Sequence, residues 1–303
     1  MGADLLVRGA VALARRAHVS PAVVAFSVVA FGTSVPELVV TLRASLTGFP
    51  GLVLGNVVGS NTANVLLVAG GSAILYPLAC GGESVRRDAA VMLLVSVAFA
   101  LACLTGDLTR LDGLLLLAGL VVVMAFMARA TFAAYRAADT SLPMDWVLGL
   151  PSQKRMITLF LVLGIVGLPV GANLLVDAAV DIAGSLGVSE TVVGLTLVAL
   201  GTSLPELATT VMAAFQRRTE VAIGTIIGSN TFNILAIMGV GATSSPQGVT
   251  ISDRFLALDL PVMLAASLVL SIFALRRKKI GRAAGIVLLT GYVAYMSVLF
   301  VTA

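Results

Sequence analysis

The sequence has little charge, one histidine and two cysteines. Asp, Glu, Lys and Arg make up 11% of its 303 residues, whereas 59% are hydrophobic and the mean hydropathy is +1.07. This composition excludes a soluble globular domain of the usual kind. Cys80 and Cys103 follow no metal-ligand or redox spacing, so we expect apolar-packed thiols. We expect His18, the lone histidine, at a membrane interface, and we expect no bound cofactor.

Signatures of an enzyme or of an export signal are missing as well. The chain has no zinc triad, no G-x-S-x-G and no pairing of Ser with Lys on facing helices, so we expect no enzyme activity. Residues 1–19 carry Asp4, Arg8, Arg15 and Arg16, which is not the pattern of a cleavable signal. The net charge of +4 says little about partners, because membrane topology decides where basic residues lie, and we expect no nucleic acid to bind.

Apolar segments recur along the whole chain and predict an all-α polytopic membrane protein. They are continuous rather than alternating, which excludes a β-barrel. About ten transmembrane helices are expected, near residues 3–18, 20–46, 52–78, 87–105, 111–136, 154–185, 190–215, 220–243, 255–275 and 281–301. The lipid bilayer is therefore the expected surrounding, in the plasma membrane.

The two halves of the chain repeat one another. Residues 2–70 align without a gap onto 171–239 with roughly 30 identities, too many for chance. This predicts a first repeat over 1–136, a cytoplasmic linker over 137–153 and a second repeat over 154–303. Five helices in each half is an odd number, so the second half must enter the membrane upside down, as in many secondary transporters.

Basic residues agree with this inverted arrangement. Most of them, such as Arg86, Arg129, Arg217 and the run Arg276–Lys279, fall on one side of the predicted topology. Arg43, Arg110 and Arg254 fall on the other side. Under the positive-inside rule the first group is cytoplasmic, which places both termini outside.

The first predicted helix is short. Gly2 aligns with Gly171, which in the second half follows a full apolar lead from Arg155 to Val170. Without such a lead, a helix starting at residue 2 cannot cross a hydrocarbon core of about 30 Å at 1.5 Å per residue. We expect the native protein to begin upstream of Met1.

The sequence F-G-T-S-V-P-E-L, starting at Phe31, and its copy L-G-T-S-L-P-E-L, starting at Leu200, carry the chemistry. Pro36 and Pro205 each lack an N–H, which frees a carbonyl and breaks the helix. Each break then gathers hydroxyls and a glutamate in an oxygen-rich set that suits Na⁺ or Ca²⁺ better than zinc or copper. The candidate ligands here are Thr33, Ser34 and Glu37 with Thr202, Ser203 and Glu206.

Glu37 and Glu206 lie deep in apolar segments, where a charge costs about 2.5–3.5 kcal/mol. Such an acid is either paired structurally or functional. No basic residue of the sequence is expected at mid-membrane depth to pair with them, so we interpret both glutamates as functional.

A second duplicated motif follows each break, G-N-V-V-G-S-N-T-A-N from Gly55 and G-T-I-I-G-S-N-T-F-N from Gly224. Its glycines are expected to let helices approach closely. Small-polar spacing alone would indicate packing only, but this motif occurs twice, each time after a Pro-Glu break, which favours a functional role. Ser60 and Asn64 share one helical face, as do Ser229 and Asn233.

Together the paired motifs closely resemble the two α-repeats of the cation/Ca²⁺ exchanger superfamily, most of all its prokaryotic Na⁺/Ca²⁺ exchanger-like members. The resemblance implies ten helices, with ions bound at the midplane by Glu37, Asn64, Glu206 and Asn233. Flanking ligands would be Ala30, Thr33 and Ser60 on one side and Ala199, Thr202 and Ser229 on the other. Several members have Asp where this chain has Asn233, so the chain has two central acids instead of three.

The resemblance implies a Ca²⁺/Na⁺ antiporter in which helices 1 and 6 slide against the ion-binding core. Their glycines, Gly2, Gly9, Gly164, Gly167 and Gly171, permit such sliding and equally permit static packing. A Ca²⁺/H⁺ antiporter of the same fold is the nearest alternative, and a channel or an intramembrane enzyme are more distant ones. We expect the protein to work as a monomer, with Ca²⁺ and Na⁺ bound only as transported ions.

Overall fold

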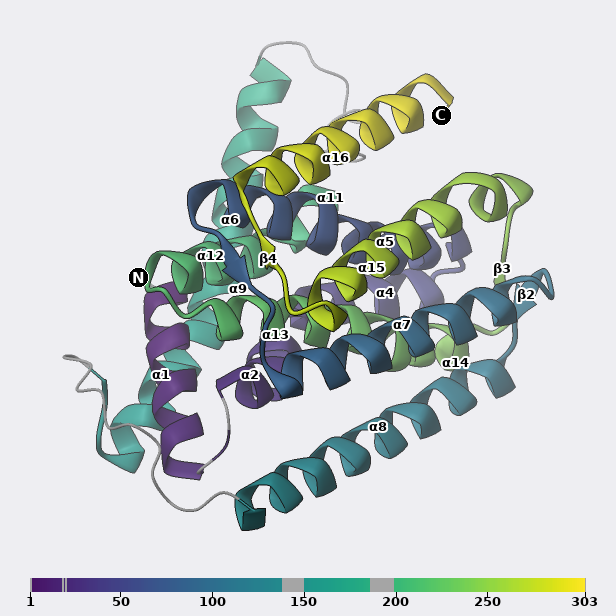
Figure 1. The fold of residues 1–303 in the computed structure, drawn as a ribbon. Coiled ribbons are helices and arrows are strands. Elements are labelled where there is room, and N and C mark those ends of the chain that lie inside the picture. Colours follow the sequence, from purple (N-terminus) through teal and green to yellow (C-terminus); the bar gives the residue numbers. More distant parts are fainter. Residues whose placement is uncertain (1, 18, 20, 138–149, 186–198, 303) are drawn as a thin grey trace.

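The computed structural model describes residues 2–17, 19, 21–137, 150–185 and 199–302, and Figure 1 shows a bundle of helices of very different lengths. The helices of the first half are α1 (Gly2–Ala17), α2 (Pro21–Val24), α3 (Ala30–Thr33), α4 (Val35–Leu46), α5 (Pro50–Ala63), α6 (Gly70–Leu75), α7 (Glu83–Cys103) and α8 (Arg110–Ala137). Those of the second half are α9 (Lys154–Ser185), α11 (Ala199–Thr202), α12 (Leu204–Phe215), α13 (Thr219–Phe232), α14 (Gly239–Ser244), α15 (Leu260–Leu275) and α16 (Arg282–Thr302).

Short π-helical turns join several of these helices into longer rods. They are η1 (Ala25–Val29), η2 (Asn64–Ala69), η4 (Asn233–Met238) and η5 (Phe255–Asp259). Through η2 and η4, α5 continues into α6 and α13 into α14, which gives two apolar spans of 26 residues each. A π-helical turn inserts one residue into the helical register and is frequent at functional sites. No pattern in the sequence predicted these turns.

Six helices among the described residues are long and apolar enough to cross a membrane, and a seventh span results if the bent pair Ala25–Thr33 and Val35–Leu46 is counted. The expectation of ten spans goes beyond this set. The range 138–149, most of the predicted linker, lies outside the described residues, as do His18 and 190–198, the first part of an expected helix.

Burial shows which spans lie in the middle. In the span Thr219–Ser244, 94% of the most apolar stretch is buried inside the protein, and in Pro50–Leu75 67% is buried. The corresponding shares for the spans within α8 and α9 are 11% each, and their outer faces expose Leu115, Val121 and Val166. Apolar side chains that point away from the core fit a lipid surrounding, so this is a multi-pass membrane protein with two central and several peripheral helices.

Both helices that carry the G-T-S-x-P-E-L motif are interrupted where the prolines predict. Ser34 separates α3 from α4 with φ −88° and ψ 8°, and Ser203 separates α11 from α12 with φ −87° and ψ 1°. The helix axis bends by 52° between the segments on either side of Ser34. Since a proline removes one helical hydrogen bond and crowds the preceding turn, the bend has a direct local cause.

Helices α1 and α9 lie against each other with glycines at the contact. A Cβ built on Gly164 would lie 2.6 Å from Cβ of Leu6, and one on Gly9 would lie 3.1 Å from the Leu161 side chain. Gly2 is in ordinary contact with Leu168, whereas Gly167 and Gly171 have no atom within 4 Å of such a Cβ. Close packing of the two helices therefore depends on Gly9 and Gly164.

Two small antiparallel sheets tie the halves together at their ends. β1 (Leu78–Ala79) pairs with β4 (Lys279–Ile280), and β2 (Asp107–Leu108) pairs with β3 (Val249–Thr250). Each sheet joins one strand from each half.

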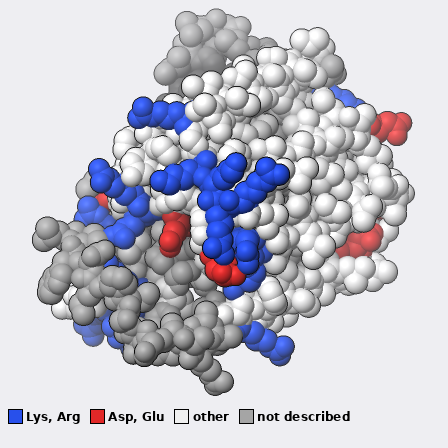
Figure 2. Space-filling view, in the orientation of Figure 1, with Lys and Arg blue, Asp and Glu red and all other residues white. Residues whose placement is uncertain are grey.

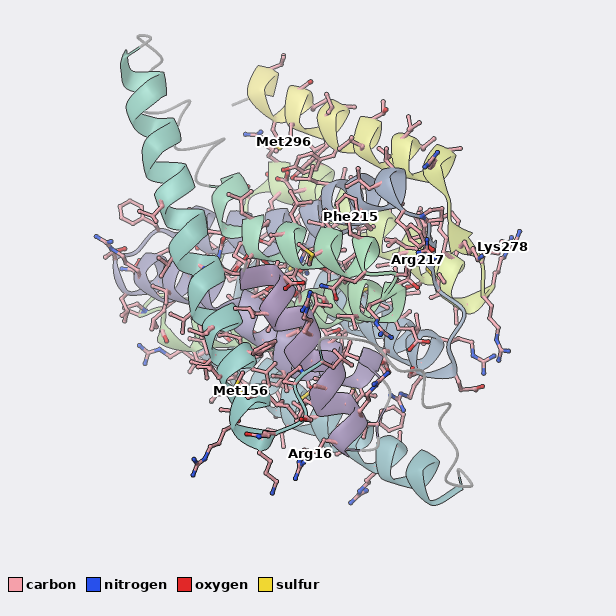
Figure 3. All side chains as sticks on the ribbon, turned by 90° about the vertical axis from the view of Figure 1, so that its left-hand side faces the viewer. Arg16, Met156, Phe215, Arg217, Lys278 and Met296 are labelled. Atoms are coloured by element: carbon pink, nitrogen blue, oxygen red, sulfur yellow. The ribbon has the colours of Figure 1, made fainter. Side chains whose placement is uncertain are left out.

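In Figure 2 most Lys and Arg atoms gather from the left to the centre of the face, and in Figure 3 Arg217 and Lys278 lie on the same side. These basic residues cluster at the end of the molecule where β1 pairs with β4.

Candidate cation site between the two halves

Glu37 and Glu206 occupy equivalent places in the first turns of α4 and α12, and each side chain is only 1% exposed. The N-terminus of a helix has free N–H groups and the positive end of the helix dipole. Both breaks therefore place a carboxylate where the backbone favours negative charge. Ser34 of the first motif also donates a hydrogen bond to Glu206 of the second, so the motifs from the two halves meet in one site.

Hydroxyl groups from both halves contact Glu206. Ser34 Oγ donates a hydrogen bond to Glu206 Oε1 at 3.1 Å, across the boundary between the halves, and Ser229 Oγ lies 3.5 Å from the same atom. The Ser203 hydroxyl, which corresponds to Ser34 in the sequence repeat, has no hydrogen-bond partner. The two halves thus supply the same residues but different bonds.

Asn64 and Asn233 begin the π-helical turns η2 and η4, and each is 1% exposed. Turn η2 contacts α12, the helix of Glu206, and turn η4 contacts α4, the helix of Glu37. Each π-helical turn therefore lies next to the glutamate helix of the other half. Asn64 Nδ2 donates to Asn230 Oδ1, and Asn233 Nδ2 donates to Asn61 Oδ1, both at 3.0 Å.

Several buried oxygens of this site have no hydrogen-bond donor among the residues that the structure describes. They are Oε2 of Glu37, Oε2 of Glu206, Oδ1 of Asn64, Oδ1 of Asn233 and Oγ of Ser203. A buried acceptor without a partner costs about 1–3 kcal/mol, and more when it is charged. Carboxylate, amide and hydroxyl oxygens are the ligands that hard cations prefer. Bound cations would supply the partners that these oxygens lack, so the chemistry of these residues fits hard cations.

The other predicted ligands lie beside these atoms with different roles. Thr33 Oγ1 donates to the Ala30 carbonyl at 3.2 Å, and the Ser34 backbone N–H donates to the same carbonyl at 3.1 Å. Ser60 is 4% exposed and Thr202 is 8% exposed. Ala199 starts α11, and its side chain lies outside the described part of the structure.

A cavity of about 730 Å³ reaches this site from one end of the molecule. Its lining includes Thr250, Ser252 and Arg254 near β3, and also Ser60 and Thr202. Gly55 and Gly59 line the cavity as well, and a Cβ added at either glycine would meet no atom within 4 Å. Among the described residues neither glycine makes the close helix contact expected of it, and Leu195, the repeat equivalent of Phe26, lies outside the described residues.

The equivalent glycine of the second half behaves as expected. A Cβ on Gly228 would lie 2.4 Å from the Phe26 carbonyl oxygen and 2.7 Å from the Ala30 Cβ. Gly228 and Gly59 hold matching positions in the repeat. Gly228 is therefore packed directly against backbone, whereas Gly59 lines a cavity as far as the described residues show.

Sequence reasoning missed three asparagines that organise the site. Asn56 Nδ2 donates to the Glu37 carbonyl at 2.9 Å and to Thr41 Oγ1 at 2.8 Å, which joins α5 to α4. Asn61 and Asn230 bond the candidate ligands Asn233 and Asn64. Asn61 and Asn230 recur in the duplicated G-S-N motif, so the repeat itself could have identified them, whereas Asn56 aligns with Thr225 and had no such signal.

The described residues contain no cluster of three or more His, Cys, Asp or Glu side chains that could hold a metal ion. The site combines two acids with neutral oxygens instead. A buried, oxygen-lined site inside apolar spans, reached by a cavity from one end, has the ligand chemistry that suits hard cations better than zinc or copper.

Comparison with known proteins agrees. The sequence matches the family described as sodium/calcium exchanger protein over residues 1–129 and 156–301. It is 35% identical to the sodium/calcium exchanger MaX1 of Methanosarcina acetivorans, covering 99% of this chain and 94% of that protein. It is also 35% identical to the inner membrane protein YrbG of Escherichia coli K12, covering 98% and 92%.

A solved structure of the sodium-calcium exchanger NCX_Mj, soaked with Na⁺ and Ca²⁺, matches with a TM-score of 0.84 and 32% sequence identity, covering 98% of this chain and 92% of that one. The chain belongs to the sodium/calcium exchanger family. MaX1 and NCX_Mj are both named as exchangers.

Proposed function

We propose that this protein is a secondary active antiporter that exchanges Ca²⁺ for Na⁺ by alternating access. The observation that carries the proposal is the set of buried acceptor oxygens without donors, to which Glu37, Glu206, Asn64, Asn233 and Ser203 each contribute one. MaX1 and NCX_Mj, the two exchangers described above, both have sodium and calcium in their names.

Charge balance explains why exchange would be obligatory. With both glutamates ionised, the site carries a charge of about −2, and burying that charge without a counterion is prohibitive in a low dielectric. One Ca²⁺ or two Na⁺ would neutralise it, and further Na⁺ would be held by neutral oxygens. Only a protein whose site holds ions would then change its access from one side of the membrane to the other. Ca²⁺ requires 6–8 oxygens, which two carboxylates with the neighbouring amides, hydroxyls and water can approach.

The contrast between Gly59 and Gly228 supports alternating access. A transporter built from two inverted halves exposes its site to one side when the halves adopt different conformations. Among the described residues Gly59 lines the cavity and Gly228 is packed against Phe26, so the described parts of the two halves differ at matching positions. In the opposite state the roles of the two glycines would be exchanged. Helices α1 and α9, in contact through Gly9 and Gly164, would be the pair that moves.

We place the cavity on the outer side of the plasma membrane. Arg254 lines it, whereas Arg217 and the run Arg276–Lys279 lie toward the opposite, β1–β4 end, which the positive-inside rule makes cytoplasmic. Both termini would then be outside. Since each half contributes to one complete site, a monomer would suffice for transport.

A Ca²⁺/H⁺ antiporter is the second candidate, because two protons would neutralise the same two carboxylates. Vesicles containing the purified protein can separate these functions. Ca²⁺ uptake driven by an outward Na⁺ gradient at equal pH on both sides supports the proposal. Uptake driven only by a pH gradient, with no response to Na⁺, would show that the coupling ion is H⁺ and not Na⁺. Gradients of K⁺ and Li⁺ serve as controls.

A further inference from the structure

Asn61 and Asn230 lie buried where the two halves meet, 1% and 0% exposed. The buried side-chain atoms of both residues are hydrogen-bonded. By contrast, Oδ1 of Asn64 and Oδ1 of Asn233 have no hydrogen-bond partner among the described residues. The four asparagines therefore form two pairs, each with one satisfied member and one member whose oxygen is free. The geometry of each pair explains this division.

The first pair is fixed by a peptide carbonyl. Asn230 Nδ2 donates to the backbone oxygen of Asn61 at 3.3 Å, and a carbonyl oxygen can only accept. Oδ1 of Asn230 must therefore face the other way, toward Asn64. Asn64 can approach that oxygen only with its Nδ2, which it does at 3.0 Å. Oδ1 of Asn64 is then turned away from the pair.

The second pair is fixed by a thioether. Asn61 Nδ2 donates to Sδ of Met263, on α15, at 3.8 Å, and this sulfur also acts only as an acceptor. Oδ1 of Asn61 then faces Asn233, which donates its Nδ2 at 3.0 Å. Oδ1 of Asn233 is turned away in the same manner as that of Asn64. The thioether is a weaker acceptor than a carbonyl, so this pair is held less firmly.

We propose that Asn61 and Asn230 are positioning residues that orient the amides of Asn233 and Asn64, so that the oxygen and not the NH₂ group of each ligand faces the transported cation. This rests on the proposed function. An amide rotated by half a turn would present the positive end of its dipole to the ion. Both of these side-chain hydrogen bonds run between the halves. Asn230 orients a ligand of the first half, and Asn61 orients a ligand of the second.

The test is a pair of crossed double-mutant cycles, with Ca²⁺ affinity measured by calorimetry on the purified protein. Asn230→Ala should weaken Ca²⁺ binding about 10- to 100-fold, the usual loss when a residue supporting a metal ligand is removed. The same change should have little further effect in an Asn64→Ala background and its full effect in an Asn233→Ala background. For Asn61→Ala the two backgrounds should exchange roles.

Equal effects in both backgrounds would mean general structural damage and would overturn the proposal. Met263→Leu provides a milder variant, because the side chains have similar volume and only the thioether acceptor is lost. It should weaken Ca²⁺ binding in the parent protein and not in the Asn233→Ala background. Unchanged affinity in the parent protein would contradict the role of Asn61.

Failure of the proposed function gives a different result. A parent protein that binds neither Ca²⁺ nor Na⁺, or a Glu37→Gln variant that binds Ca²⁺ as the parent does, would refute the cation site itself. Additive cycles in a parent protein that binds Ca²⁺ would refute only the positioning roles of Asn61 and Asn230.

Discussion

Ser34, in the first half, donates a hydrogen bond to Glu206, in the second half, at 3.1 Å. Ser34 is also the residue at which the first motif helix breaks, three positions before Glu37. The same break therefore places one carboxylate in the site and holds the other. This explains how two motifs far apart in the sequence form a single site, and it makes Ser34 a direct probe of that site.

Replacing Ser34 by Ala should weaken Ca²⁺ binding. A hydrogen bond to a charged group contributes about 1.5–3 kcal/mol, so losing it should raise the Ca²⁺ concentration for half-maximal uptake about tenfold or more. The Ser45→Ala variant is a matched control. Ser45 is likewise a buried serine that bonds across the halves at 2.8 Å, but its acceptor is the Gly241 backbone carbonyl and not a carboxylate. Equal loss of affinity in both variants would contradict the role of Ser34.

Gly59→Ala should separate ion binding from ion exchange. In this structure a Cβ at Gly59 meets no atom within 4 Å, so folding and Ca²⁺ binding from the cavity side should be unchanged. In the opposite state Gly59 is expected to be packed as Gly228 is here, and the added methyl group should disfavour that state. We expect near-normal Ca²⁺ affinity with exchange reduced about tenfold or more, the factor for each 1.4 kcal/mol of strain.

Gly167→Ala controls for the loss of a helical glycine, because no atom lies within 4 Å of a Cβ there either. It should leave both Ca²⁺ affinity and exchange unchanged. Normal exchange in Gly59→Ala would contradict the idea that the two halves exchange conformations during transport.

Cysteine labelling can test the proposed orientation. The two native cysteines, Cys80 and Cys103, are 1% and 0% exposed and should react slowly, so an added cysteine can be followed alone. Ser252 and Ser152 are both exposed, beside the cavity and before α9 respectively. With a membrane-impermeant thiol reagent on intact cells, Ser252→Cys should be labelled and Ser152→Cys should be labelled only after the cells are opened. The reverse pattern would invert the assignment of inside and outside.

The sequence predicts a large part of this structure because its strongest signals are local. Pro36 and Pro205 mark both helix breaks to within two residues, since a missing N–H acts on the adjacent turn. Long apolar runs mark the spans for a similar reason. The duplicated motifs likewise lead to Glu37 and Glu206, which are both buried, and the two motifs are joined by the hydrogen bond from Ser34 to Glu206.

What the sequence does not predict depends on contacts between distant residues. The different environments of Gly59 and Gly228 among the described residues cannot follow from matching motifs, because they depend on which distant segment packs against each glycine. Likewise, the amide orientations of Asn64 and Asn233 depend on partners in the other half and, through Asn61, on Met263. The π-helical turns at both asparagines had no signal in the residue pattern.

The two glutamates are the centre of this account, and their neutralisation is its most direct test. Ca²⁺ uptake driven by an outward Na⁺ gradient should be measured in vesicles containing the parent protein, Glu37→Gln, Glu206→Gln or Glu220→Gln. Glu220 is an exposed acid at the start of α13 and controls for the loss of one carboxylate. We predict that uptake is abolished by the first two changes and retained in the third. Undiminished uptake in Glu37→Gln or in Glu206→Gln would contradict the account.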